Sequence, residues 1–102
     1  MAGAPEGPRR ITSLSPPAPT PSRGRTALAY ELAREQLVSL DILDAQGRLA
    51  RTLVPERMEV AGPHRLSWDG RDADGREAAP GVYLAVLHAG EQRLVRRLVI
   101  VR

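Results

Sequence analysis

Residues 62–83 read Gly-Pro-His-Arg-Leu-Ser-Trp-Asp-Gly-Arg-Asp-Ala-Asp-Gly-Arg-Glu-Ala-Ala-Pro-Gly-Val-Tyr, and the chain is organised around them. A short alternating segment at residues 64–68 runs into a stretch crowded with Asp, Gly and Pro, and a second apolar run begins at Gly81. This pattern indicates strand, structured loop and strand. The only tryptophan, Trp68, ends the first run. Because Trp buries a large area, we expect it to fill the core, the alternative being an exposed platform for a ligand.

Alternation of apolar with polar or small side chains predicts further strands upstream. Residues 26–32 and 37–43 both show the period of a half-buried strand. Residues 27–37 are also rich in helix formers, so helix is the competing interpretation there. We expect strand, because the alternation repeats in the second segment.

Two hairpins are predicted from turn chemistry. Residues 44–47, Asp-Ala-Gln-Gly, suit a type I turn with a glycine bulge, after which residues 48–54 return antiparallel. Residues 81–89 are apolar on both faces, which places them centrally in their sheet. Gly90-Glu91 suits a type II′ turn that returns the chain along residues 92–101.

A connection is predicted between the first hairpin and the tryptophan strand. Pro55 should end the preceding strand, because proline donates no backbone hydrogen bond. Residues 55–63 should then run as a loop, with Gly62-Pro63 turning the chain into the next strand.

Composition limits the class of protein. A chain of 102 residues forms one small domain, whose core buries only a little over ~60% of the unfolded surface. The aromatic residues are only Tyr30, Trp68 and Tyr83, so the core must be mainly aliphatic. The absence of cysteine excludes disulfides, thiolate metal sites and a cysteine nucleophile.

Charge and proline divide the chain in two. Residues 1–25 hold six of the nine prolines and four Arg against Glu6, which predicts a largely disordered linker, with a proline-motif ligand as the alternative. Residues 26–102, the expected folded domain, carry eleven Arg against eleven acidic residues. Because the folded part is neutral, we expect no nucleic-acid binding. Residues 11–14 could add a short edge strand.

The polar residues do not form a pattern typical of catalysis or metal binding. Residues 69–76 resemble a calcium loop in their carboxylates, but Gly70 stands where an EF-hand needs a ligand and no Glu follows at the twelfth position. Asp side chains that bond backbone N–H groups two residues on explain the stretch without an ion. His64 and His88 are expected as separate strand histidines. We therefore expect no catalytic residues, no cofactor and no metal.

Nothing in the sequence predicts a targeting or membrane segment. The N-terminus lacks an apolar signal-peptide region, and no window approaches 18 consecutive apolar residues. We expect no signal peptide in this chain and no membrane insertion.

Several of these segments, in this order, resemble the FlgD-type immunoglobulin-like domain and its relatives, the C-terminal sorting domains of type IX secretion cargo. The resemblance covers most of residues 14–102 and includes Val-Ser-Leu-Asp-Ile-Leu-Asp-Ala-Gln-Gly-Arg at 38–48, Ala-Gly-Pro-His at 61–64, Trp-Asp-Gly-Arg-Asp at 68–72, Gly75, and Pro-Gly-Val-Tyr at 80–83. Pro19-Thr20-Pro21 stands in place of the sorting domains' Pro-Asn-Pro lead, and Ser22 stands where Phe follows it.

The resemblance implies an all-β fold, an immunoglobulin-like β-sandwich of about seven antiparallel strands. It assigns structural roles to a set of motif residues: Gly47, Gly62, Trp68, Asp69, Gly70, Asp72, Gly75, Gly81 and Tyr83. It further implies a non-catalytic C-terminal module of a larger bacterial protein, secreted or at the cell surface, that serves in secretion sorting or surface attachment. The alternative is an assembly scaffold of the flagellar hook-cap type. In both cases the expected partners are proteins: the secretion or attachment machinery or neighbouring subunits, and the upstream domain of a longer parent chain.

Overall fold

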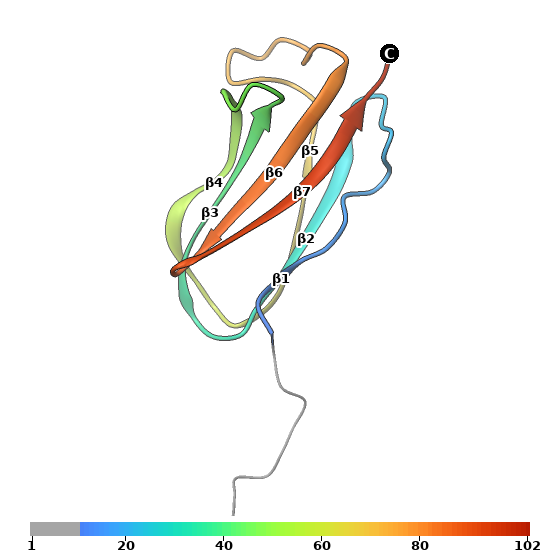
Figure 1. Ribbon diagram of the computed structural model, residues 1–102. Helices are drawn as coiled ribbons and strands as arrows, with labels where there is room; N and C mark the ends of the chain where they lie inside the picture. The colour runs from blue at the N-terminus through green and yellow to red at the C-terminus, as the bar shows by residue number, and fades with distance from the viewer. Residues whose placement is uncertain (1–10) are drawn as a thin grey trace, which may run out of the picture.

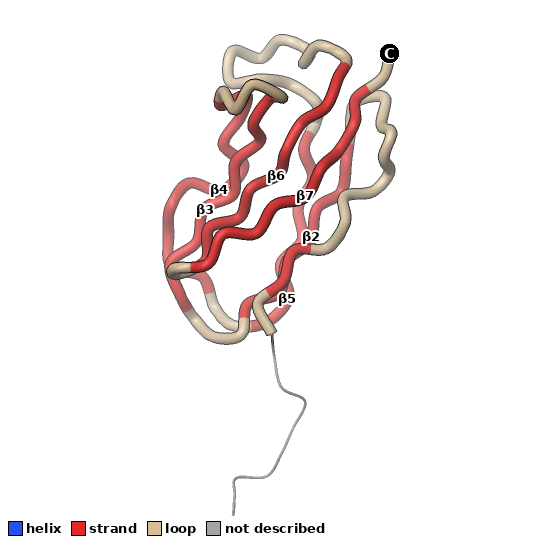
Figure 2. Tube along the Cα trace, in the orientation of Figure 1, coloured by secondary structure: helices blue, strands red, loops and turns tan. Residues whose placement is uncertain are grey.

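The computed structural model describes residues 11–102, which form an immunoglobulin-like sandwich of seven antiparallel strands (Figures 1 and 2). The strands are β1 (Ser13–Leu14), β2 (Thr26–Leu32), β3 (Gln36–Asp44), β4 (Leu49–Glu59), β5 (Gly62–Trp68), β6 (Gly81–Ala89) and β7 (Gln92–Ile100). One sheet has the order β1-β2-β5 and the other the order β4-β3-β6-β7. The predicted fold class is confirmed. No helix among residues 11–102 is long and apolar enough to cross a membrane.

The two hairpins of the four-stranded sheet form as the turn residues predict. In the β3–β4 turn the Gly47 N–H donates to the Asp44 carbonyl at 2.9 Å, and Gly47 has a φ of +84°, as a type I turn with a glycine bulge requires. In the β6–β7 turn Gly90 has a φ of +59°, and no described non-glycine residue has a positive φ. That combination excludes a type I′ turn and agrees with type II′. Strand β6 lies between β3 and β7, as its two apolar faces predicted.

Strand β4 continues through Pro55, so the predicted end of this strand is wrong. Val38 pairs with Arg57 and Leu40 pairs with Val54, which leaves Pro55 and Glu56 together opposite a single residue of β3. This is a β-bulge, and β4 is the edge strand of its sheet. Proline is tolerated at an edge or a bulge because no neighbouring strand needs its missing N–H group.

The expected loop at residues 55–63 is correspondingly short. Strand β4 ends at Glu59 and β5 begins at Gly62, so only Val60 and Ala61 lie between the strands. Gly62 and Pro63 pair with the last residues of β2 instead of forming a turn. Strand β5 is also an edge strand, which again explains why proline fits.

The core lies between the sheets and is mainly aliphatic. It contains alternate side chains of β2, β3, β6 and β7, closed by three aromatic residues. Trp68 is 0% exposed and packs edge to face against Tyr83, with ring centroids 5.5 Å apart. The prediction that Trp68 fills the core is confirmed, and the alternative of an exposed platform is excluded.

The segment before β2 belongs to the sandwich, contrary to the prediction. We expected residues 1–25 to form a disordered linker and the domain to begin at Thr26. Residues 1–10 lie outside the described part of the chain, but residues 11–25 run along both sheets (Figure 1). Leu14, in β1, is 3% exposed and belongs to the core.

Residues 11–25 can pair with the sheets because the non-proline residues among them donate backbone hydrogen bonds. The N–H groups of Ser15 and Ala18 donate to carbonyls of β2 at 2.9 and 3.1 Å, and the N–H of Ser22 donates to a carbonyl of β7 at 2.8 Å. The prolines have no N–H to satisfy, so they leave no donor unpaired. The segment thus pairs first with one sheet and then, in parallel, with the edge of the other. Arg96 joins the two sheets at this edge, where its Nε donates to the Leu14 carbonyl at 2.7 Å.

Candidate functional site

The loop between β5 and β6, residues 69–80, closes one end of the sandwich and is held there by buried aromatic side chains. The Trp68 Nε1–H donates to the Arg71 carbonyl at 2.8 Å, and the Tyr83 hydroxyl donates to the Ala79 carbonyl at 2.6 Å. Trp68 is the last residue of β5 and Tyr83 is the third residue of β6, so the core rings anchor both ends of the loop. The polar atom of each ring is used in holding this loop.

Gly70 is required by close approach as well as by conformation. A Cβ atom at this position would lie 2.7 Å from the Gly24 carbonyl oxygen, and Gly70 has a φ of +81°. Any other residue would clash with the backbone of the segment before β2 and would adopt a conformation unfavourable to L-residues. The loop and this segment therefore pack backbone against backbone.

Two identical turns stand side by side at this end of the sandwich. Residues 44–48 and 72–76 share the sequence Asp-Ala-Xaa-Gly-Arg. In each, the Asp carboxylate accepts the N–H groups of the second and fourth following residues at 2.9–3.0 Å, and the glycine N–H donates to the Asp carbonyl. The expectation that Asp side chains build these turns is confirmed. The repeated pentapeptide is visible in the sequence, but its two copies were not recognised as the same structural element.

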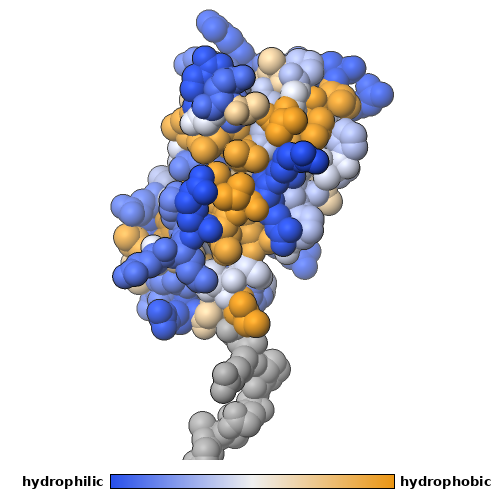
Figure 3. Space-filling view, viewed as in Figure 1, coloured by the Kyte–Doolittle hydropathy of each residue, from blue (hydrophilic) through white to orange (hydrophobic). Residues whose placement is uncertain are grey.

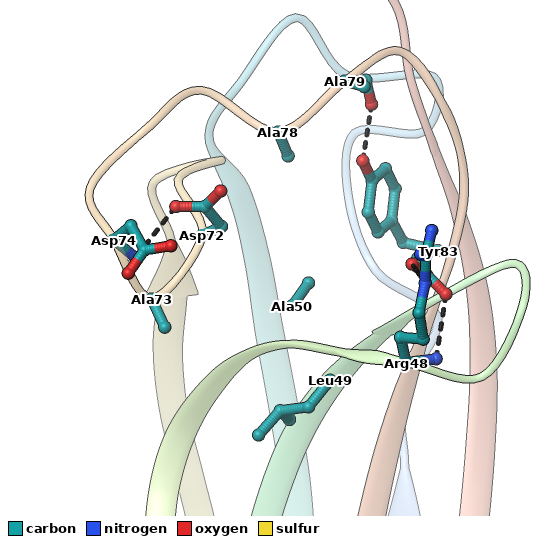
Figure 4. A pocket seen from close by; sticks show the side chains of 10 residues that line it. Arg48, Leu49, Ala50, Asp72, Ala73, Asp74, Ala78, Ala79 and Tyr83 are labelled. Carbon is teal, nitrogen blue, oxygen red and sulfur yellow. Dashed lines mark hydrogen bonds and ion pairs between the residues drawn. The ribbon is translucent and has the colours of Figure 1, made fainter.

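A hollow of about 310 Å³ lies between the two turns (Figure 4). Its lining combines both turns with the start of β4 and the loop: Asp44, Arg48, Leu49, Ala50, Asp72, Ala73, Asp74, Ala78, Ala79 and Tyr83. The Asp44 carboxylate also pairs with Arg48 Nε at 2.9 Å. Hydrogen bonds from the Arg48 backbone and side chain and from Gln46 lower the pKa of Asp44, while burial raises the pKa of Tyr83 and the nearby Asp44 charge adds to that effect.

Three of the polar side chains around this hollow bind groups of the fold itself. The Asp44 and Asp72 carboxylates each bind their own turn, and the Tyr83 hydroxyl binds the loop. Within residues 11–102, no group of three or more His, Asp or Glu side chains is arranged to hold a metal ion. Asp44, Asp72 and Tyr83 therefore hold the two turns and the loop in place at this hollow.

A second polar cluster lies at the opposite end, where β4 passes into β5. The Tyr30 hydroxyl donates to the Glu59 carboxylate, which also accepts from Arg57 Nε at 2.9 Å. The His64 ring stacks on Tyr30 with centroids 5.0 Å apart, and its Nε2 lies 2.8 Å from the Val60 carbonyl oxygen. Burial raises the pKa of Tyr30, and the hydrogen bond to Glu59 raises it further. Burial opposes ionisation of Glu59, but the bonds from Tyr30 and Arg57 outweigh it and lower the pKa of Glu59.

This second cluster ties strands together. Tyr30 is in β2, Glu59 ends β4 and His64 is in β5, so the cluster links the two sheets. His88 is exposed on β6, in the other sheet from His64. The two histidines are in separate strand contexts, as expected.

Most of the predicted motif residues come together at the loop end of the sandwich. Eight of them lie in the two turns, in the loop or at the strand ends beside it: Gly47, Trp68, Asp69, Gly70, Asp72, Gly75, Gly81 and Tyr83. Gly62 does not join them, because it begins β5 at the other end and pairs with Leu32. Sequence reasoning missed two arginines that clamp the loop. Arg51 Nη1 donates to the Arg71 carbonyl at 3.1 Å, and Arg102 Nη2 donates to the Ala78 carbonyl.

Comparison of the sequence with protein families gives one match over most of the chain. The sequence model of the FlgD Ig-like domain matches residues 20–92. No curated protein is similar enough to count as a match.

Solved structures share the fold. Dimeric latent PorU from Porphyromonas gingivalis is 19% identical with a TM-score of 0.65. The match includes 94% of this chain and 10% of the PorU chain. PorZ, an essential surface component of the type IX secretion system of the same organism, is 21% identical with a TM-score of 0.58, and 89% of this chain covers 11% of it. FlgD from Xanthomonas campestris, described in connection with flagellar hook capping, is 24% identical with a TM-score of 0.57, and 89% of this chain covers 66% of it.

Proposed function

The chain belongs to the FlgD Ig-like domain family, and from this premise we propose that it is a non-catalytic module of a larger exported bacterial protein, serving in secretion sorting or surface attachment. The parent protein would supply any activity, and the module would be recognised by protein components of the export or attachment machinery. The module would accordingly be secreted or found at the cell surface as part of that parent.

This proposal rests on the hydrogen bonds made by the polar side chains at the loop end of the sandwich. The Asp44 and Asp72 carboxylates and the Tyr83 hydroxyl at the loop end bind backbone groups of their own turns and loop, which favours the outer surface of the domain as the part that binds other molecules. Sandwiches of the same fold make up about a tenth of the chains of PorZ and PorU, which agrees with a module carried by a longer protein. We propose on the same grounds that the nine motif residues are structural, with no role in catalysis.

A passenger fusion tests the sorting function. Residues 1–102 would be fused behind an unrelated passenger that has its own inner-membrane export signal, in a host with type IX secretion machinery. We expect the passenger to reach the cell surface, where added protease digests it. The matched control carries Trp68→Ala, which we expect to destabilise or unfold the module and so to leave the passenger in the periplasm. If the folded, unsubstituted fusion stays in the periplasm, the sorting function is wrong.

The scaffold alternative is favoured by the family itself and by the share of Xanthomonas campestris FlgD that the chain covers. A domain exchange distinguishes it from sorting. The matching domain of that FlgD would be replaced by residues 11–102, and motility and hook formation would be scored. A sorting module should give no hooks, whereas restored hooks together with a fusion that remains periplasmic would establish the scaffold function.

A further inference from the structure

The outer side of the four-stranded sheet carries a group of apolar side chains that are at least partly exposed to solvent, apart from Val86, which is 2% exposed. We call them the outer apolar face, defined as Leu43 of β3, Leu49 of β4, Val82, Leu84 and Val86 of β6, and Val95 and Val99 of β7. Side chains alternate between the two sides of a sheet, and the core residues of β6 and β7 lie on the opposite side: Tyr83, Ala85, Leu87, Leu98 and Ile100.

Strand register places these residues side by side. Val82 pairs with Val99, Val86 pairs with Val95, and Leu43 lies between Leu84 and Leu49. Leu49 is 59% exposed and Val95 is 39% exposed. Figure 3, seen from the same side as Figure 1, shows apolar side chains gathered in a stripe with hydrophilic side chains on both sides. A contiguous apolar stripe of this kind is typical of an interaction surface.

Positive charge borders the stripe along β7. Arg93 and Arg97 flank Val95 on the same side of the strand, and both are exposed. Neither arginine makes a hydrogen bond or ion pair to another residue of the described chain. The carboxylate on this face belongs to Asp41, beside Val86, and it already accepts a hydrogen bond from the Thr52 hydroxyl at 2.8 Å. The border therefore offers cations and has no free carboxylate to pair with them.

We propose that the outer apolar face is a docking surface for another protein segment, one with an aliphatic surface bordered by carboxylates that pair with Arg93 and Arg97. The aliphatic side chains would supply the buried area, and the charges would set the orientation of the partner. This proposal adds a binding surface to the proposed function. It rests on that function in one respect, namely that the partner is a protein.

Two other occupants fit the face less well. Membrane-surface binding relies on aromatic residues at the interface, but Tyr30, Trp68 and Tyr83, all the aromatic residues of the chain, are buried. A second copy of the chain would bring Arg93 and Arg97 again, with only the engaged Asp41 to meet them. A partner with its own carboxylates satisfies both arginines.

A pair of matched peptides tests the proposal. Each is an amphipathic helix with the same leucine face, bordered by Glu in one peptide and by Lys in the other, and each is titrated into residues 1–102 while amide chemical shifts are recorded. We expect the Glu peptide to bind, with shifts confined to the four-stranded sheet, β3, β4, β6 and β7. The Lys peptide should bind roughly tenfold more weakly, since two exposed ion pairs become two repulsions.

Charge reversal makes the test specific. The double substitution Arg93→Glu with Arg97→Glu should reverse the preference between the two peptides. Arg65→Glu is the matched control, because Arg65 is exposed on the three-stranded sheet and should leave the preference unchanged. Equal binding of both peptides, shifts on other strands, or an unreversed preference in the double variant would overturn the proposal.

The other two occupants give distinct results. Sedimentation equilibrium of the unsubstituted chain should show a monomer, and a dimer that Val95→Glu dissociates would assign the face to a second copy instead. Vesicles containing phosphatidylglycerol should not bind the chain. Binding that Val95→Glu abolishes would assign the face to a membrane surface. The peptide, sedimentation and vesicle experiments can all contradict the docking surface while the passenger fusion still reaches the cell surface. The docking surface and the proposed function can therefore be refuted independently.

Discussion

Leu14 lies in a proline-rich segment that composition alone would assign to a linker, yet its side chain is 3% exposed in the core. Replacing it with alanine therefore tests whether this segment belongs to the fold. Leu→Ala substitutions at buried sites cost ~2–5 kcal/mol of unfolding free energy. Strand β1 is a two-residue edge strand that can partly collapse onto the gap, so we expect the lower part of that range, ~2–3 kcal/mol.

Ile11 provides a matched control in the same segment, because it is also a large aliphatic residue but is 72% exposed. Ile11→Ala should change the unfolding free energy by less than ~0.5 kcal/mol. The loss expected for Leu14→Ala corresponds to a fall in melting temperature of roughly 10–20 °C for a domain of this size.

Urea unfolding followed by the fluorescence of Trp68 measures both variants, since the buried indole reports loss of the core. The denaturant slope should be unchanged, which would show that the native state loses stability without becoming less compact. If Leu14→Ala stays within ~0.5 kcal/mol of the unsubstituted chain, as Ile11→Ala should, the segment contributes nothing to stability and the linker interpretation is restored.

Three further substitutions test the core and the polar cluster. Trp68→Ala should cost ~3–5 kcal/mol and could unfold the domain, as followed by circular dichroism, while native Trp68 should emit at the short wavelengths of a buried indole. Thr26→Val should raise the unfolding free energy by about 1 kcal/mol or more in urea titrations, because the buried Thr26 hydroxyl has no partner in the described chain, and no gain would show that it is satisfied. Tyr30→Phe should cost ~1.5–3 kcal/mol at pH 7, because it removes a hydrogen bond to the Glu59 carboxylate. The lowered pKa of Glu59 means that this contribution is present above the unfolded pKa of ~4.3 and is lost as pH falls through the folded value, so a cost unchanged from pH 7 to pH 3 would contradict it.

At the loop end of the sandwich, local sequence rules predict the turns but not how the turns are arranged relative to each other. The residues that bond within a turn can be predicted, because Asp at its first position and Gly at its last act over four or five residues. The repeated Asp-Ala-Xaa-Gly-Arg turns at residues 44–48 and 72–76 obey this rule twice. Their meeting around one hollow could not be predicted, because it depends on which strands pair across the sandwich.

The two wrong predictions that were based on proline, the end of β4 at Pro55 and the linker before Thr26, have a common cause. Pro55 continues β4, and the prolines before Thr26 accompany a paired segment, although proline locally disfavours a strand. What decides the outcome is whether a neighbouring strand requires the missing N–H group. Both segments lie at sheet edges, and edge position is a property of the whole fold.

The sequence by itself determined the existence of the strands from Thr26 onward and their hairpin turns, apart from the end of β4 and the start of β5, because alternation and turn chemistry are local. It also determined the burial of Trp68, because a small domain with one tryptophan gains most by burying its largest side chain. The tertiary structure alone decided that residues 11–25 join both sheets, that Tyr30, Glu59 and His64 meet, and that the outer side of one sheet carries partly exposed apolar side chains. Each of these results depends on contacts between residues distant in sequence. Such contacts follow from the pairing order of the strands, and alternation along a single strand cannot specify that order.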